Sequence, residues 1–275
     1  ANLQSGQFDL IERVSPTDVA QIKADGKLKL TTAPDIGYSY IVFNVANGPR
    51  SKVLADPRLR EAIELSIDRE QLVKVAFENL FIPGNQWVAP ISPYYEKNLP
   101  LPKRDVARAK ALLKEAGQPN LTFKMITRPD RDFQVPAQII QAMLAESGIN
   151  LVIDTQENVT GLNNGAKGDF EALFSFWSGR PDPDGNISLY NVCDAGANMA
   201  KYCDQEMNKI LSQARQEVDE PVRKKLYDQA AAIFRRDRQM LPLWYRNIFI
   251  AHRATVQGFV PYPDGLVRLV NVKLP

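Results

Sequence analysis

The stretch DPRLREAIELSIDREQLVKVAF, residues 56–77, predicts two consecutive short helices that meet at an angle. Asp56 is suited to accept hydrogen bonds from the first free N–H groups of a helix, and Pro57 fits the first helical position because its φ is already fixed. Apolar residues then follow at helical spacing. A second start appears at Asp68, with Gln71 three residues later, so we expect a new helix to begin there.

The same stretch resembles the segment D.RVRQA...AIDR..I....F of the family 5 extracellular solute-binding proteins of ABC importers, which include the dipeptide- and oligopeptide-binding proteins. Other segments resemble the family in the family's own order, so the resemblance covers nearly the whole chain. They are SGQFDLIERVSPTDVAQIK (residues 5–23), RDVARAKALLKEAG (104–117), FWSGRPDPDGN (176–186) and RKKLYDQAAAIFRRDRQMLPLWY (223–245).

The composition agrees with a soluble binding lobe. Of the 275 residues 44% are apolar, which allows a sizeable core in one or two domains. The 34 basic residues nearly balance the 32 acidic ones. No basic run is interleaved with aromatic residues, and no apolar run approaches the roughly 18 residues of a membrane helix. We therefore expect neither nucleic-acid binding nor a membrane span.

The resemblance also implies a domain organisation. Family members are about twice as long, and a signal peptide and most of a first lobe precede the segment that matches residues 5–16. The chain begins without a charged and apolar leader, so we expect the signal peptide only in a full-length form. Residues 1–41 are then a fragment of the first lobe with the hinge, residues 42–248 the second lobe, and residues 249–275 the return to the first lobe.

Hydrophobic patterning predicts an α/β fold. The family resemblance implies that this fold is a periplasmic-binding-protein-like second lobe, with added strands that belong to the first lobe. The pattern reads strand, helix, strand, helix, strand over residues 121–126, 133–147, 150–154, 159–167 and 172–177. Ligands of such parallel βαβαβ units sit beyond the carboxyl ends of the strands. Two later helices, 204–218 and 221–237, precede strands at 240–244 and 248–252 that lead back toward the first lobe.

The loop after the first of these strands contains Arg128. In dipeptide-binding relatives an Arg in the matching loop takes the peptide carboxylate, which suits a guanidinium that can make two parallel hydrogen bonds. The resemblance therefore implies that Arg128 binds the ligand. The alternative is an ion pair with Asp130 or Asp132 at the surface.

The loop after residue 177 departs from the peptide-binding pattern. Peptide binders carry an Asp there that receives the α-ammonium group, whereas the nearest position in this chain is Arg180. Asp182 would substitute only if the loop has shifted. Two arginines favour an anionic or polyhydroxylated solute over a zwitterionic peptide. The alternative is that Arg180 pairs with Asp182 or Asp184 and holds the loop.

Trp177 ends the strand before this loop. An indole in that place can form the floor of a binding cleft and stack on a flat or sugar-like ligand. The alternative is that Trp177 is a buried core residue without contact to a ligand. Trp244 and Tyr245 carry the same two possibilities near the expected hinge.

The two cysteines, Cys193 and Cys203, lie ten residues apart in a polar segment. The spacing differs from the Cys-x-x-Cys of redox enzymes, and no second pair completes a zinc site. A disulfide that closes a loop, as in dipeptide-binding relatives, is expected, and it requires an oxidising compartment. Two free buried thiols are the alternative.

No enzyme signature is found. His252 is the single histidine, and the sequence lacks a nucleophile elbow, a phosphate loop and a metal-spaced cluster. PDPDG at 181–185 lacks the later ligands of an EF-hand loop. We expect no catalytic residue, metal or cofactor.

The resemblance thus implies the solute-binding component of an ABC import system, located in the periplasm or outside the cell and associated with the membrane. A small solute, peptide-like or anionic, would be captured by hinge closure and passed to the transmembrane subunits of the permease, and a monomer is expected. One alternative is an interaction or sensor module that has kept the lobe without transport. Another is a hydrolase that uses Asp182 or Asp184 with Arg180.

Overall fold

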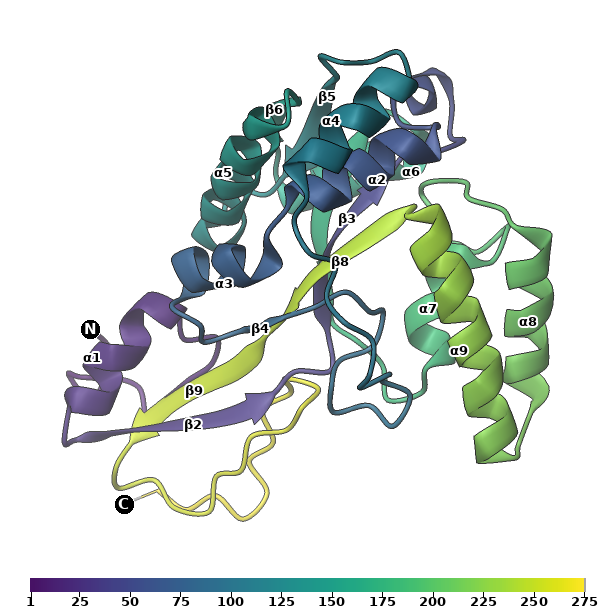
Figure 1. The fold of residues 1–275 in the computed structure, drawn as a ribbon. Helices are drawn as coiled ribbons and strands as arrows, with labels where there is room; N and C mark the ends of the chain where they lie inside the picture. Colours follow the sequence, from purple (N-terminus) through teal and green to yellow (C-terminus); the bar gives the residue numbers. More distant parts are fainter. Residues whose placement is uncertain (275) are drawn as a thin grey trace.

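The computed structural model describes residues 1–274 and contains a large mixed sheet, covered by helices on both faces, and a small sheet beside it (Figure 1). The large sheet has six strands in the order β4-β8-β3-β7-β5-β6. Its strands are β3 (Tyr38–Phe43), β4 (Ile82–Pro83), β5 (Thr122–Thr127), β6 (Asn150–Thr155), β7 (Ala172–Trp177) and β8 (Met240–Tyr245).

The predicted βαβαβ unit is confirmed. Strand β5 lies between β6 and β7 and is parallel to both. The connecting helices are α5 (Arg131–Glu146) and α6 (Asn158–Lys167). The α/β fold class predicted for the chain is therefore correct.

Strand β3 was not predicted as a strand. All six of its residues are buried, so its sequence lacks the alternation that marks a half-exposed strand. It runs antiparallel to both β7 and β8 in the middle of the sheet. As a result the carboxyl ends of β5, β7 and β8 and the start of β3 share one edge.

The small sheet pairs strands from the two ends of the chain. Its order is β1-β9-β2, all antiparallel, with β1 (Leu10–Ile11), β2 (Leu28–Pro34) and β9 (Asn247–Arg253). Two connections join it to the large sheet: residues 35–37 between β2 and β3, and Arg246 between β8 and β9. The expected boundaries at 41 and 248 fall inside β3 and β9, and the division into lobes stays a prediction.

The helices form two layers on the large sheet. The helix pair predicted from residues 56–77 is present as α2 (Pro57–Ser66) and α3 (Arg69–Phe77), and Asp56 and Asp68 cap them by accepting from the N–H groups of Arg58 and Gln71. This pair packs with α4 (Val106–Glu115) and α5. The other layer contains α7 (Asp184–Asn191), α8 (Gln205–Gln216) and α9 (Glu220–Asp237).

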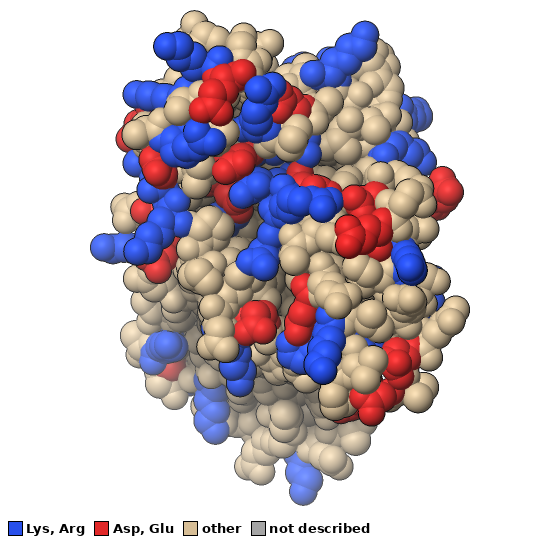
Figure 2. All heavy atoms as spheres, turned by 45° about the vertical axis from the view of Figure 1, so that its right-hand side comes forward, with Lys and Arg blue, Asp and Glu red and all other residues tan. Residues whose placement is uncertain are grey.

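The short remaining elements are η1 (Pro16–Asp18) and α1 (Val19–Ala24) beside the small sheet, and η2 (Pro49–Val53). Basic and acidic side chains are interspersed on the face of the molecule that Figure 2 shows. Among residues 1–274, no helix has the length and apolar character needed to cross a membrane.

Candidate solute-binding edge

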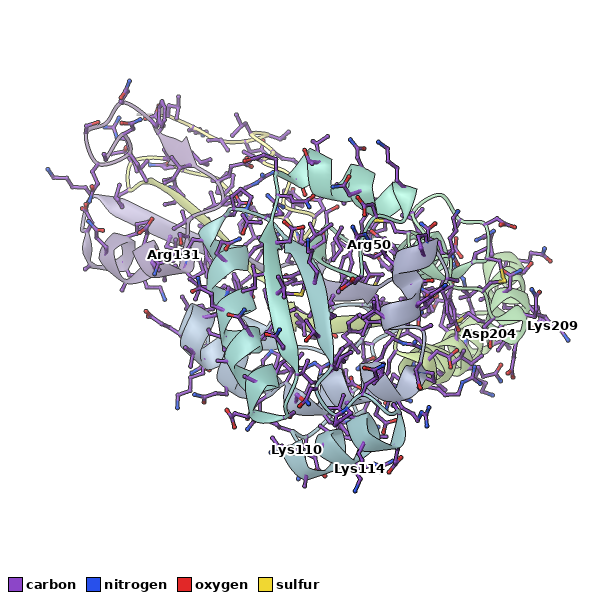
Figure 3. All side chains as sticks on the ribbon, turned by 90° about the horizontal axis from the view of Figure 1, so that it is seen from above. Arg50, Lys110, Lys114, Arg131, Asp204 and Lys209 are labelled. Carbon is purple, nitrogen blue, oxygen red and sulfur yellow. A yellow bond between two sulfur atoms is a disulfide. The ribbon has the colours of Figure 1, made fainter. Side chains whose placement is uncertain are left out.

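The candidate site is the edge of the large sheet where β5, β7 and β8 end. Because β8 continues through Arg246 into β9, this edge faces the small sheet. The first turn of α5 lies at the same end, and Figure 3 shows Arg131 on the side of α5 toward the small sheet. The carboxyl ends of parallel strands are the usual ligand site of α/β sheets. We call this region the strand edge.

Arg128 lies in the loop between β5 and α5. Its Nε donates to Oδ2 of Asp130 at 2.8 Å, and its guanidinium carbon lies 4.7 Å from the centre of the Phe133 ring. The ion pair named as an alternative is thus present. Within residues 1–274, neither Nη1 nor Nη2 of Arg128 has a hydrogen-bond partner, so the guanidinium keeps donors for a ligand. Its ligand role stays a prediction.

Thr127 and Arg128 also line a small cavity of about 10 Å³, together with Gln156 and Asn158. The Thr127 hydroxyl is buried and finds no partner within the described chain. A cavity of this size has room for about one water molecule. A larger depression of about 470 Å³ lies on the polar surface of α3 and extends to Asn79 and Pro83.

Trp177 and Arg180 are held together by Asn186, which the sequence did not single out. Oδ1 of Asn186 accepts from Nε1 of Trp177 at 2.9 Å and from the backbone N–H of Arg180 at 2.7 Å. Its Nδ2 donates to the carbonyl of Arg180 at 2.8 Å. The side chain of Asn186 is only 3% exposed. A single buried amide therefore fixes the indole and the loop that follows it.

The guanidinium of Arg180 lies over the indole of Trp177, with its carbon 4.4 Å from the ring centre. Tyr190 also packs against Trp177 in a T-shaped arrangement, with 5.4 Å between the ring centres. Trp177 therefore contacts a core residue, and one face of its indole is covered by Arg180. A cation–π contact of this kind typically contributes about 0.5–2 kcal/mol.

Asp182 in the loop and Asp184 at the start of α7 pair with arginines of α9 and α8 rather than with Arg180. Asp182 accepts from Nη2 of Arg223 on α9 at 3.0 Å, and Asp184 pairs with Arg215 on α8 at 3.2 Å. Arg180 itself donates from Nη1 to the Ser178 hydroxyl and to a backbone carbonyl. No salt bridge joins Arg180 to either Asp in the part of the chain that the structure describes.

Gly179 allows this loop to lie against the β2–β3 connection. It has φ +75°, and a Cβ there would lie 2.3 Å from the carbonyl oxygen of Ile36. Only glycine satisfies both conditions without displacing the backbone. The Trp177–Arg180 loop is thus fixed directly on a connection between the two sheets.

Asp35 and Arg246, both missed by the sequence analysis, form an ion pair between the two connections. Nη2 of Arg246 donates to Oδ2 of Asp35 at 3.0 Å, and the Arg246 guanidinium carbon lies 3.4 Å from the Phe176 ring centre. Burial raises the pKa of Asp35, while the charge of Arg246 opposes this rise. No local sequence pattern marks the pair, because its members are 211 residues apart.

The predicted disulfide between Cys193 and Cys203 is present. Asn198 fills the loop that it closes: Nδ2 donates to the carbonyls of Val192 and Tyr202, and Oδ1 accepts the N–H of Tyr202. The alternative of two free thiols is therefore wrong.

The strand edge offers groups that bind rather than groups that react. Across the described residues, no cluster of three His, Cys, Asp or Glu is arranged for a metal. His252 is buried in β9, away from the strand edge, with Nδ1 2.9 Å from the carbonyl oxygen of Arg253. Arginine, tryptophan and amide groups at a strand edge can hold an anionic or planar solute.

Comparisons with known proteins agree with this arrangement. The family model described as "Bacterial extracellular solute-binding proteins, family 5 Middle" matches residues 1–198. Di/tripeptide-binding protein 4 of Pseudomonas aeruginosa is 32% identical over 276 residues, which cover 95% of this chain and 50% of the relative. The dipeptide-binding protein of Escherichia coli is 26% identical over 284 residues, covering 100% and 52%.

A solved structure has the same fold. The periplasmic binding protein DppA of Helicobacter pylori, in complex with the peptide STSA, superposes with a TM-score of 0.86 at 25% identity, over 94% of this chain and 51% of that protein. The chain spans about half the length of the curated relatives it matches. With a family model over residues 1–198 and similarities along nearly its whole length, the chain belongs to the family 5 bacterial extracellular solute-binding proteins, which bind solutes and are not enzymes.

Proposed function

We propose that this chain supplies one wall of the solute site of an ABC import receptor, which captures a small solute and delivers it to the membrane permease. The observation that carries the proposal is the Asn186-held pair of Trp177 and Arg180 at the strand edge. The relatives named as di/tripeptide- and dipeptide-binding proteins support a peptide-like solute.

The charges of the two loops favour a solute with a negative group. Arg128 and Arg180 each keep guanidinium N–H groups without a partner among residues 1–274. Asp182, which the ammonium group of a peptide would need, is already paired with Arg223. Guanidinium groups with free donors bind carboxylates by charge-assisted hydrogen bonds. Arg128 and Arg180 are therefore the proposed anion-binding residues.

Capture would proceed by closure about the two connections between the sheets. Residues 35–37 and Arg246 are the points where the chain passes from one sheet to the other. A rotation about these two connections would move the lobe that contains the small sheet over the strand edge and bury the solute. The transmembrane subunits of the permease would then recognise the closed form. The receptor would act as a monomer.

Native mass spectrometry of the intact protein, isolated from a periplasmic fraction without denaturation, tests this function. We expect a co-purified small molecule, and calorimetry with peptides, sugars and organic anions then defines its class. Arg128→Gln and Arg180→Gln should each weaken binding at least about tenfold, the effect of losing one charge-assisted hydrogen bond.

Arg50→Gln is the matched control, since Arg50 pairs with Asp169 away from the strand edge. It should bind like the wild type. A spectrum that stays empty after exposure to a metabolite extract would contradict the proposal and favour the interaction or sensor module.

A further inference from the structure

Asp35 joins the two connections between the sheets into one unit. Its Oδ1 accepts from the backbone N–H of Gly37 at 2.8 Å, and its Oδ2 accepts from Nη2 of Arg246 at 3.0 Å. The backbone N–H of Asp35 also donates to the Arg246 carbonyl at 3.0 Å. The Asp35 side chain is only 5% exposed, and a buried carboxylate that loses its partner is strongly destabilising. The two connections are therefore expected to move together.

This unit belongs to the small sheet. The pairing of β2 with β9 ends at Pro34 and Asn247, and Asp35 and Arg246 adjoin these two residues. The hydrogen bond between the backbones of Asp35 and Arg246 continues the ladder by one step. A rotation between the two sheets is therefore expected beyond this step, where the chain enters β3 and leaves β8 (Figure 1).

The unit packs on an aromatic ring of the large sheet. The guanidinium carbon of Arg246 lies 3.4 Å from the centre of the Phe176 ring, on β7. Gly37, on the other connection, approaches the same end of β7: a Cβ there would lie 2.6 Å from Cζ of Phe176 and 2.3 Å from the carbonyl oxygen of Trp177. Arg246 and Phe176 lie on opposite sides of the expected rotation, so closure cannot leave their contact unchanged.

The same end of β7 leads into the loop that contains Arg180. Gly179 in that loop lies against the β2–β3 connection, where an added Cβ would come within 2.3 Å of the carbonyl oxygen of Ile36. The backbone N–H of Ile36 donates to the carbonyl of Pro263 at 3.1 Å, so the C-terminal segment also holds this connection. A solute that contacts the Arg180 loop would therefore act on residues next to the hinge.

We propose that Asp35, Arg246 and Phe176 form a hinge latch. The ion pair makes the two connections turn together, and the contact of Arg246 with Phe176 fixes the angle between the sheets until a solute closes the receptor. In closing, the guanidinium slides off the Phe176 ring while it stays paired with Asp35. This inference rests on the proposed function, because closure is the movement that the latch controls. None of the three residues needs to contact the solute.

Distances between two spin labels in the intact protein test the latch without any solute. Lys29→Cys on β2 and Lys209→Cys on α8 place one label on each side of the hinge at exposed positions, and the two native cysteines form a disulfide. Phe176→Leu keeps an apolar side chain and removes the ring. It should lower the ratio of latched to unlatched molecules about tenfold, the effect of losing one partly buried cation–π contact. The label distances should then broaden or gain a second maximum.

Asp35→Asn is the second variant, because it removes the charge and keeps the shape. It should broaden the label distances in the same way. Asp9→Asn is the matched control: Asp9 pairs with Arg253 at 3.1 Å, and both residues lie at the small sheet, on one side of the hinge only. Its label distances should match those of the wild type.

Unchanged label distances in either variant, once circular dichroism shows that it is folded, would overturn the latch. The same broadening in Asp9→Asn would overturn it too. If Asp35→Asn does not fold, Phe176→Leu decides alone, because it leaves the ion pair in place. The measurement uses no solute, so its failure is separate from that of the proposed function: a protein that binds no solute would overturn that function whatever the label distances.

Discussion

Replacing Asn186, in the first turn of α7, by alanine should loosen the Trp177–Arg180 loop of the candidate site. The side chain makes three hydrogen bonds, of 2.9, 2.7 and 2.8 Å, to Trp177 and to the backbone of Arg180, and it is 3% exposed. At about 1 kcal/mol for each buried bond, the substitution should lower the free energy of unfolding by about 3 kcal/mol. That is a large share of the roughly 5–15 kcal/mol of a typical domain.

Urea unfolding followed by tryptophan fluorescence measures this loss, and Trp177 serves as a local probe. Solute affinity should also fall at least about tenfold, because the indole and the Arg180 loop lose their common anchor. Asn163→Ala is the matched control: Asn163 is exposed on α6 and has no side-chain hydrogen bond to the described residues. If Asn186→Ala unfolds within about 0.5 kcal/mol of the wild type, the claim that this amide holds the site is wrong.

Two further outcomes are expected. Replacing Cys193 and Cys203 by serine removes the disulfide, which joins residues 10 positions apart in sequence. In the chain-entropy model this should lower the free energy of unfolding by about 2–3 kcal/mol. Dithiothreitol should have no further effect on the stability of that variant. Gly179→Ala places a Cβ 2.3 Å from the Ile36 carbonyl oxygen, at a residue with φ +75°. It should lower the free energy of unfolding in urea by about 1–3 kcal/mol. An unchanged unfolding midpoint would refute the close approach.

Local patterns were enough to predict helices α2, α3, α5, α6, α8 and α9 and the parallel strands, whereas α1, α4 and α7 were not predicted. The caps at Asp56 and Asp68 act within three residues, and the strands of the βαβαβ unit are short apolar runs bounded by turn residues. Strand β3 lacks such a signal, because a strand with both faces buried has no period-two pattern. Its place between β7 and β8 depends on residues at least 129 positions further along the chain, the separation of Phe43 and Ala172.

The candidate site was predictable in location and less so in detail. The loops with Arg128 and Arg180 follow predicted strands, and the structure places both at the strand edge. Asn186 and Arg246 were missed because nothing in the residues around them shows which distant groups they contact. A buried amide and a lone arginine are common in sequences, and their roles follow only from their neighbours in space.

The sequence by itself determined the family, the α/β unit and the edge where ligands are expected, and it favoured a disulfide between Cys193 and Cys203 without excluding free thiols. Those features depend on local spacing or on segments long enough to be distinctive. Only the tertiary structure decided which charges meet: Asp182 pairs with Arg223 and Asp35 with Arg246, while Arg180 lies on Trp177. Ion pairs form between groups within about 4 Å of each other, and that distance is set by the packing of helices and strands rather than by separation along the chain.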